Sequence, residues 1–161
     1  MLQLVPQGWL GWNFDVLDNE RKIAEIKTST LPESGAISLE GADFRARREG
    51  IFSGEFFLEN DGETIARAQK PSALVNSFNI EYSDRRYTLK KESWVGRSFV
   101  LIQGDLEVGS IRPEGVLSRK ATVDLPGDVP MPLQVFVIWL TILLWKREAD
   151  AGAAASVAAS T

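Results

Sequence analysis

The residues best suited to binding chemistry in this 161-residue chain are basic side chains that alternate with apolar ones. In an extended strand whose apolar residues face inward, the basic residues between them point outward. If two such strands adjoin, their outward groups form a cationic patch suited to phosphate or to anionic lipid headgroups. The candidate ligand-binding residues are Arg45, Arg47, Arg86 and Lys90.

The competing interpretation of these basic residues is an ordinary solvated surface. Acidic residues are interspersed with them, and the formal net charge of the chain is −4. A negative chain also lacks the basic surface that broad nucleic-acid binding requires, because phosphates must be neutralised. We therefore expect no nucleic-acid partner, and composition favours the solvated-surface interpretation.

Carboxylates gather at the tips of the predicted hairpins. Several neighbouring acids can bind a divalent cation, and a spaced pair can hydrolyse a glycosidic bond. The chain has no loop with calcium-ligand spacing, and nothing selects one pair, so turn formation is the favoured role. These residues are Asp15, Asp18, Glu20, Asp61, Glu63, Asp105 and Glu107.

Histidine and cysteine are both absent from the sequence. A Ser–His–Asp triad, a disulfide framework and a thiolate metal site are therefore excluded. The sequence also contains no glycine-rich phosphate loop and no G-x-S-x-G nucleophile motif. We expect a non-enzymatic protein that uses no cofactor and no metal.

Three tryptophans lie among the predicted strands. Trp9 and Trp12 flank Gly11 before the first hairpin. The favoured interpretation is that they cap one end of a barrel, and the alternative is an anchor at a membrane interface. Trp94, in the connection over residues 92–97, is the better candidate for an exposed contact.

The elements that would position these residues are β-hairpins. From Phe14 onward, short runs of alternating apolar residues meet across Gly, Asn and Asp, which is typical of antiparallel hairpins. Residues 120–125 predict another strand, and residues 9–12 are a further candidate. The total is ten to twelve strands. The hairpins span residues 14–26, 37–47, 56–68, 78–89 and 99–111.

Strand side chains alone fill the interior of a barrel of about eight strands, whereas a barrel of sixteen or more leaves a channel. A barrel of ten to twelve strands lies between these sizes, so its lumen must be occupied by another element. Residues 133–145 form the one apolar helix candidate, LQVFVIWLTILLW, and they are apolar on every side. We therefore expect an all-β closed barrel that encloses this C-terminal helix. Its predicted core residues are Leu133, Phe136, Val137, Trp139, Leu140, Leu143 and Leu144.

The predicted organisation is one domain over residues 1–147, with its central helix at 133–147 and an Ala-rich flexible tail at 148–161. Lys146 and Arg147 would close the helix, since basic residues suit a helix C-terminus. One alternative treats residues 129–145 as a tail anchor in a thin membrane. In that case the barrel would lose its filling.

The hairpin units 56–70, 78–91 and 99–113, the segment 121–126 and the closing apolar helix resemble the tubby C-terminal-like superfamily. This superfamily includes the phospholipid scramblases and the LURP-one-related proteins, and the likeness covers nearly all of residues 9–147. The resemblance implies a twelve-stranded barrel around a hydrophobic helix and an association with membrane lipid. The tubby signature is not recognisable, and the scramblase cysteine cluster is missing.

These observations favour a non-enzymatic binding module for anionic lipid headgroups or another phosphorylated ligand. The alternative is a structural or protein-interaction protein without a small-molecule ligand. The N-terminus has no basic region followed by a continuous apolar stretch, so we expect no signal peptide. The expected location is the cytoplasm or the surface of the membrane beside it. The oligomeric state is not determined by the sequence.

Overall fold

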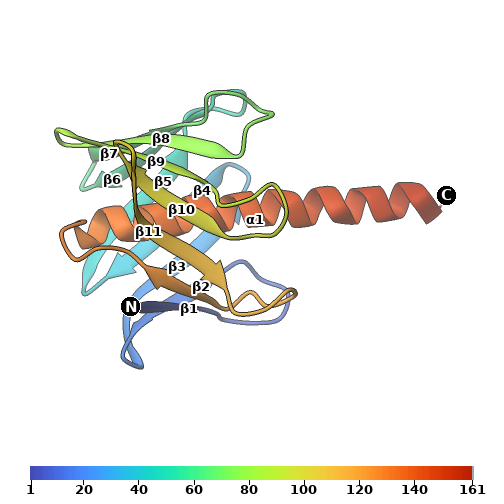
Figure 1. Cartoon of the computed structure of the whole chain (residues 1–161), viewed down its shortest axis with the longest axis horizontal. Coiled ribbons are helices and arrows are strands. Elements are labelled where there is room, and N and C mark those ends of the chain that lie inside the picture. Colours follow the sequence, from blue (N-terminus) through green and yellow to red (C-terminus); the bar gives the residue numbers. More distant parts are fainter. Residues whose placement is uncertain (161) are drawn as a thin grey trace.

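The computed structural model describes residues 1–160, which form twelve β-strands and one α-helix (Figure 1). The strands are β1 (Leu2–Pro6), β2 (Phe14–Asp18), β3 (Arg21–Thr30), β4 (Glu33–Leu39), β5 (Ala42–Arg48), β6 (Glu55–Asn60), β7 (Glu63–Gln69), β8 (Ser77–Tyr82), β9 (Arg85–Lys91), β10 (Phe99–Gln103), β11 (Leu106–Pro113) and β12 (Ala121–Asp124). The helix is α1 (Met131–Ser160).

The strands form one closed antiparallel barrel in which each strand pairs with its sequence neighbours. Closure comes from β1, which pairs with both β2 and β12. The predicted fold class, an all-β barrel that encloses a C-terminal helix, is confirmed. The additional strand suggested at residues 9–12 is wrong, because the first strand is β1 and those residues lie in the connection to β2.

Because every strand runs opposite to its neighbours, the connections fall into two sets at the two ends of the barrel. One end, the turn rim, consists of five two-residue turns. The first residue of every turn has a positive φ, and in three turns both residues do, as type I′ hairpins require. The turns are Asn19 and Glu20, Glu40 and Gly41, Asp61 and Gly62, Ser83 and Asp84, and Gly104 and Asp105.

The other end, the loop rim, carries the connections β1–β2, β3–β4, β5–β6, β7–β8, β9–β10 and β11–β12. All of these except β3–β4 are longer than the turns, and they surround the place where α1 leaves the barrel (Figure 1). The helix starts at the turn rim, runs through the lumen and projects beyond the loop rim. It therefore links the two ends.

All seven predicted core residues of α1 are buried in the barrel, at 2% exposure or less. Trp139 lies at the centre, stacked on Phe136 and edge-on to Phe56. Gly35 on β4 makes room for its indole, since a Cβ atom there would lie 2.5 Å from Trp139 Nε1. The apolar character of the helix on every side is explained by the ring of inward-facing strand residues around it.

The predicted helix bounds of 133–147 are wrong: α1 begins at Met131 and continues to Ser160. Lys146 and Arg147 therefore lie inside the helix. A helix already nucleated in the barrel adds residues at low cost, and alanine is the best helix former, so the Ala-rich segment continues it. The flexibility predicted for 148–161 stays a prediction, and Thr161 lies outside the described residues.

The segment considered as a tail anchor is enclosed by the strands, with residues 133–145 buried. Within residues 1–160, no helix is both long enough and apolar enough to span a membrane.

Candidate functional site

The four predicted ligand-binding residues lie on the outer wall of the barrel, as their alternation indicates, but in two separate pairs. Arg45 and Arg47 are on β5, whereas Arg86 and Lys90 are on β9. Three strands stand between β5 and β9, which separates them by roughly 19 Å along the sheet at ~4.8 Å per strand. The two strands do not adjoin, so one shared patch does not form.

Two of these four residues form ion pairs with acidic neighbours. The Nε atom of Arg47 lies 2.5 Å from Glu59 Oε1, and Arg86 lies 3.7 Å from Glu81. Arg45 and Lys90 are exposed and form no ion pair within residues 1–160. Ligand binding by these four residues stays a prediction.

The turn rim collects the acidic residues. Each of its five turns carries one carboxylate, and all five are exposed: Glu20, Glu40, Asp61, Asp84 and Asp105. In the part of the chain that the structure describes, no group of three or more Asp or Glu residues is arranged to hold a metal ion. These acids act as turn residues and give this end of the barrel a negative charge.

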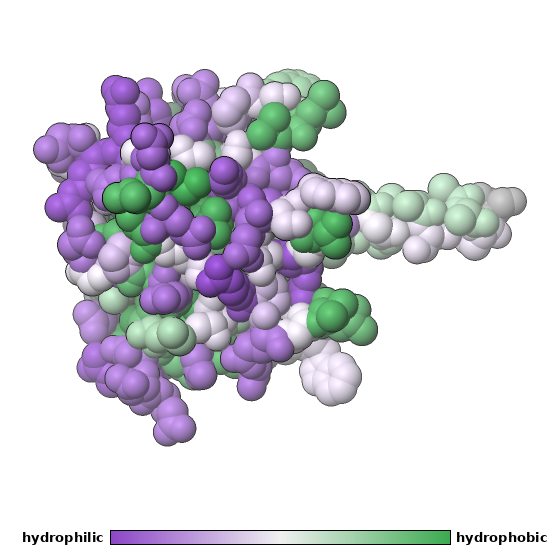
Figure 2. All heavy atoms as spheres, viewed as in Figure 1, coloured by the Kyte–Doolittle hydropathy of each residue, from purple (hydrophilic) through white to green (hydrophobic). Residues whose placement is uncertain are grey.

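The loop rim collects exposed apolar side chains instead. Every one of its six loops carries at least one large apolar residue in contact with water. Figure 2 shows apolar and near-neutral residues at the loop tips beside the projecting helix, and mostly hydrophilic residues at the opposite end. This apolar crown consists of Trp9, Leu10, Leu31, Ile51, Phe52, Leu74, Val75, Trp94, Val95, Val116 and Leu117.

The exposure of the crown residues is nearly complete at the aromatic tips. Trp9, Phe52 and Trp94 are 96%, 94% and 92% exposed. Trp94, the better candidate for an exposed contact, is exposed, and its contact with a partner stays a prediction. The expectation that Trp9 caps the barrel is wrong, because its ring is exposed, whereas the Trp12 ring packs 6.4 Å from that of Phe14 between centroids.

Basic side chains hold the crown loops in place through backbone carbonyls. Arg97 donates from Nη2 to the carbonyls of Gly115, Val116 and Ser118 at 2.6–3.0 Å, which ties the β9–β10 connection to the β11–β12 loop. Arg119 donates to the carbonyls of the β1–β2 loop and lies over the ring of Trp12. The crown is therefore an organised surface.

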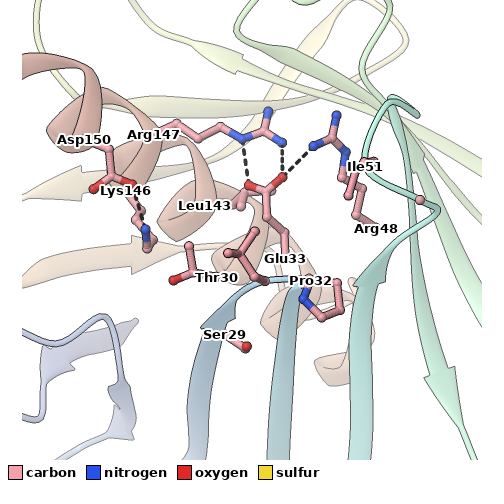
Figure 3. A pocket seen from close by; sticks show the side chains of 12 residues that line it. Ser29, Thr30, Pro32, Glu33, Arg48, Ile51, Leu143, Lys146, Arg147 and Asp150 are labelled. Atoms are coloured by element: carbon pink, nitrogen blue, oxygen red, sulfur yellow. Dashed lines mark hydrogen bonds and ion pairs between the residues drawn. The ribbon is translucent and has the colours of Figure 1, made fainter. Parts of the chain in front are cut away.

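A cluster of charged residues lies at the base of the crown, where α1 leaves the barrel. Glu33 accepts three hydrogen bonds: from Arg48 Nη1 at 2.8 Å, and from Arg147 Nε and Nη2 at 2.9 and 2.7 Å (Figure 3). Burial raises the pKa of Glu33, but the hydrogen bond and charge of Arg147 and the charge of Arg48 lower it by more. The net result is a pKa below the ordinary value of 4.5. Glu33 is therefore ionised at neutral pH.

Lys70 adds a third cation beside the two arginines. The residue is only 9% exposed, and its Nζ donates to the carbonyls of Ser72 and Ala73 at 2.7 and 2.9 Å. Burial lowers the pKa of Lys70, and repulsion from Arg147 and Arg48 lowers it further. No carboxylate of residues 1–160 forms an ion pair with this ammonium group.

Arg48, Lys70 and Arg147 line one hollow of about 300 Å³, together with Phe56 and residues of the β5–β6 and β7–β8 loops. We call it the cation recess. The guanidinium carbons of Arg48 and Arg147 lie 5.9 and 5.7 Å from the centroid of the Phe56 ring. A second hollow of about 230 Å³ lies on the other side of the same two arginines, toward Glu33 and Ile51 (Figure 3).

The helix loses its charges as it leaves the rim. Glu148 pairs with Lys91, and Asp150 lies 2.7 Å from Lys146 Nζ. Residues 151–160 carry no ionisable side chain and are mostly alanine. The projecting end of α1 is thus a slim, uncharged rod.

Comparisons with protein-family models, with curated sequences and with solved structures find no match for this chain. The resemblance to the tubby C-terminal-like superfamily stays a prediction.

Sequence reasoning concentrated on the strands and missed the loops between the hairpins. A signal was present, because loops are normally polar, whereas these connections carry adjacent apolar pairs. The cation recess gave no such signal. Arg48, Lys70 and Arg147 are far apart in sequence, and only closure of the barrel brings them together.

Proposed function

We propose that this protein is a non-enzymatic peripheral module that docks its loop rim onto an anionic lipid bilayer from the cytoplasmic side. One observation carries this proposal: every loop of one rim presents exposed apolar side chains, while every turn of the other rim presents a carboxylate. Folding does not require an exposed tryptophan or phenylalanine at a loop tip. A contiguous exposed apolar surface of this kind is typical of an interaction site.

The apolar crown supplies enough energy for reversible binding. Full burial of an aromatic or aliphatic side chain contributes ~1.5–3 kcal/mol, so Trp9, Phe52 and Trp94 together offer roughly 4–9 kcal/mol before the cost of association. Tryptophan also suits the headgroup level of a bilayer, because its ring is apolar and its N–H donates a hydrogen bond. Loops already fixed by Arg97 and Arg119 lose little further entropy on binding.

Charge sets the orientation. An anionic membrane repels the carboxylates of the turn rim and attracts basic residues near the loop rim, at about 1 kcal/mol per residue close to the surface. Arg119 and Lys120 lie at the end of the β11–β12 loop, and Arg97 lies in the β9–β10 connection. The loop rim therefore faces the lipid.

The projecting helix favours a bilayer over a rigid protein partner. Residues 151–160 extend about 15 Å beyond Asp150, at ~1.5 Å per residue, which is half of a ~30 Å hydrocarbon core. A protein that covered the crown would need a matching hole for this rod. A fluid bilayer admits a slim rod of small uncharged residues without one.

Co-sedimentation with vesicles tests the proposal. Wild type is compared with the triple variant Trp9→Ser, Phe52→Ser and Trp94→Ser, on phosphatidylcholine vesicles with and without phosphatidylglycerol. We expect wild type to bind the anionic vesicles and the triple variant to lose at least ~100-fold in affinity, since ~1.4 kcal/mol is tenfold. The free energy of unfolding should change by less than ~0.5 kcal/mol, because these side chains are exposed.

The matched control is Leu106→Ser, which removes a 71% exposed apolar side chain next to a turn of the opposite rim. This variant should bind as wild type does. Equal absence of wild-type binding to both vesicle types would overturn the proposal. A crown-dependent dimer in light scattering without vesicle binding would also overturn it, and would assign the crown to self-association.

A further inference from the structure

We propose that the cation recess of Arg48, Lys70 and Arg147 binds the dianion of a phosphate monoester. This inference deepens the proposed function, since it names the headgroup chemistry that the loop rim would select. It also applies to a free phosphate ester in solution, which does not depend on membrane docking. The two sources can therefore be separated.

The charge of the recess matches a dianion. Three cations line or border it, and the carboxylate of Glu33 neutralises one of them, which leaves a net charge of +2. Lys146 adds nothing, because Asp150 balances it. The carboxylates of the neighbouring β5–β6 segment, Glu49 and Glu55, line neither of the two hollows.

Each of the three cations keeps N–H groups without an acceptor in the described part of the chain. Arg48 uses Nε for the Ser53 carbonyl and Nη1 for Glu33, so Nη2 is unused. Arg147 uses Nε and Nη2 for Glu33, so Nη1 is unused. In Figure 3, one nitrogen of each guanidinium points away from Glu33. Phosphate oxygens are strong acceptors for such groups.

Lys70 is the residue that a purely structural account explains least. It is a buried charge whose partners are two backbone carbonyls, and it lies beside two other cations. Burying a charge without an ionic partner is costly. An anion between Lys70 and the arginines would convert three mutually repelling groups into ligands for one centre.

The recess also lies at the right level for a lipid headgroup. Phe52 belongs to both its lining and the apolar crown, and Ser72 and Ala73 of the recess precede the crown residue Leu74. A phosphate bound to the recess would be at the membrane surface when Phe52 enters the lipid. Phe56 forms the wall beneath the arginines and keeps their planes in place through cation–π contacts.

The solution arm of the test uses sn-glycerol 3-phosphate as the probe, with glycerol as the uncharged control. Binding is followed on wild type by calorimetry and by the Nε–Hε NMR signals of the arginines. We expect saturable binding and shifts of the Arg48 and Arg147 signals. Absence of both calorimetric binding and signal shifts would overturn the inference, and this readout requires no variant.

The variant for this arm is Lys70→Met, which keeps the apolar stem and removes the charge. We expect at least a tenfold loss of affinity for glycerol 3-phosphate. The matched control, Lys27→Met, removes an exposed lysine of β3 outside the recess and should change the affinity by less than twofold. Equal affinities of the two variants would contradict a role for the recess. If Lys70→Met does not fold, the wild-type signals decide.

The vesicle arm compares phosphatidic acid, a phosphate monoester, with phosphatidylglycerol, a diester, at matched surface potential. We expect tighter binding to phosphatidic acid, and Lys70→Met should remove this preference while leaving binding to phosphatidylglycerol. Equal binding to the two vesicle types, together with no binding of glycerol 3-phosphate, would overturn phosphate binding by the recess but not membrane docking by the loop rim. Binding of glycerol 3-phosphate without vesicle binding would support the recess and overturn the docking.

Discussion

The two rims of the barrel connect the same twelve strands, yet they differ in the length of their connections and in the residues that these carry. The turn rim consists of two-residue turns with one carboxylate each, and the loop rim consists mainly of longer connections with apolar tips. At the turn rim, backbone geometry explains many of the residue types, since a positive φ favours the Gly, Asn and Asp found at Asn19, Gly41, Asp61, Gly62 and Gly104. At the loop rim no such requirement explains the exposed tryptophans. The difference separates residues that the fold needs from residues available for binding.

The charged residues show the same division. On the turn rim, Glu40 is exposed and lies 3.4 Å from the exposed Arg21. On the loop rim, Glu33 is mostly buried and accepts three hydrogen bonds from two arginines. Exposed pairs contribute little to stability, whereas a shielded network with full hydrogen bonding contributes more. The loop rim therefore has fixed charges as well as apolar tips.

The largest expected effect belongs to neither rim, because α1 supports both. Replacing Trp139→Ala removes the central side chain of the lumen, which contacts Phe56 and Phe136. We expect a loss of ~3–5 kcal/mol in the free energy of unfolding, as for other large-to-small core changes. Urea denaturation followed by circular dichroism measures it. A loss below 1 kcal/mol would show that the helix does not hold the two ends together.

The next effect distinguishes the rims directly. Glu33→Gln removes the charge that holds Arg48 and Arg147, and we expect it to cost ~1–3 kcal/mol of unfolding free energy. Glu40→Gln, at the turn rim, should cost less than ~0.5 kcal/mol, because the pair is exposed. Both variants are measured by the same denaturation experiment. Equal losses of unfolding free energy in the two variants would contradict the claim that Glu33 stabilises the fold more than Glu40 does.

A pH series sharpens the role of Glu33. Its pKa in the folded protein is lower than the ordinary value of 4.5, so its stabilising contribution is complete above pH 4.5. This contribution is lost as the pH falls through the lower folded value. The difference in unfolding free energy between wild type and Glu33→Gln should therefore shrink below pH 4.5. A difference that stays constant down to pH 2 would contradict this assignment.

The smallest expected effect concerns the outer wall between the rims. The double variant Arg45→Gln and Arg86→Gln removes two of the basic residues that the sequence suggested as ligands. They lie on β5 and β9 outside the loop rim, so binding to anionic vesicles should fall by less than ~threefold, well within ~1 kcal/mol per residue. Co-sedimentation measures this. A tenfold loss of affinity for the vesicles would show that the outer wall contributes to the binding site.

Strands and their closure were accessible from the sequence because they follow short-range periodicity. Alternation around Tyr87 and Leu89 identified β9, and the all-round apolar character of residues 133–145 required an enclosing barrel. The helix end was misplaced because Lys146 and Arg147 look like a C-terminal cap. In the fold they are rim residues of a helix that continues through alanines.

The site was less accessible because it depends on contacts distant in sequence. Arg48 was among the basic residues visible in the chain, but its partner Glu33 and its neighbour Arg147 are not placed by any local pattern. Trp94 could be singled out as a candidate for exposure, since it lies between two strands. The apolar crown to which it belongs forms only in the folded barrel, where every second connection lies at the same end.

The most direct test of the account asks which rim enters the lipid. The chain contains no cysteine, so Phe52→Cys and Asp61→Cys each provide one unique attachment point for an environment-sensitive fluorophore, at the loop rim and at the turn rim. On anionic vesicles, the label at position 52 should shift to the blue and gain intensity, while the label at position 61 should keep its aqueous spectrum. A lipid-like spectrum at position 61, or an unchanged spectrum at position 52 on bound protein, would contradict the account.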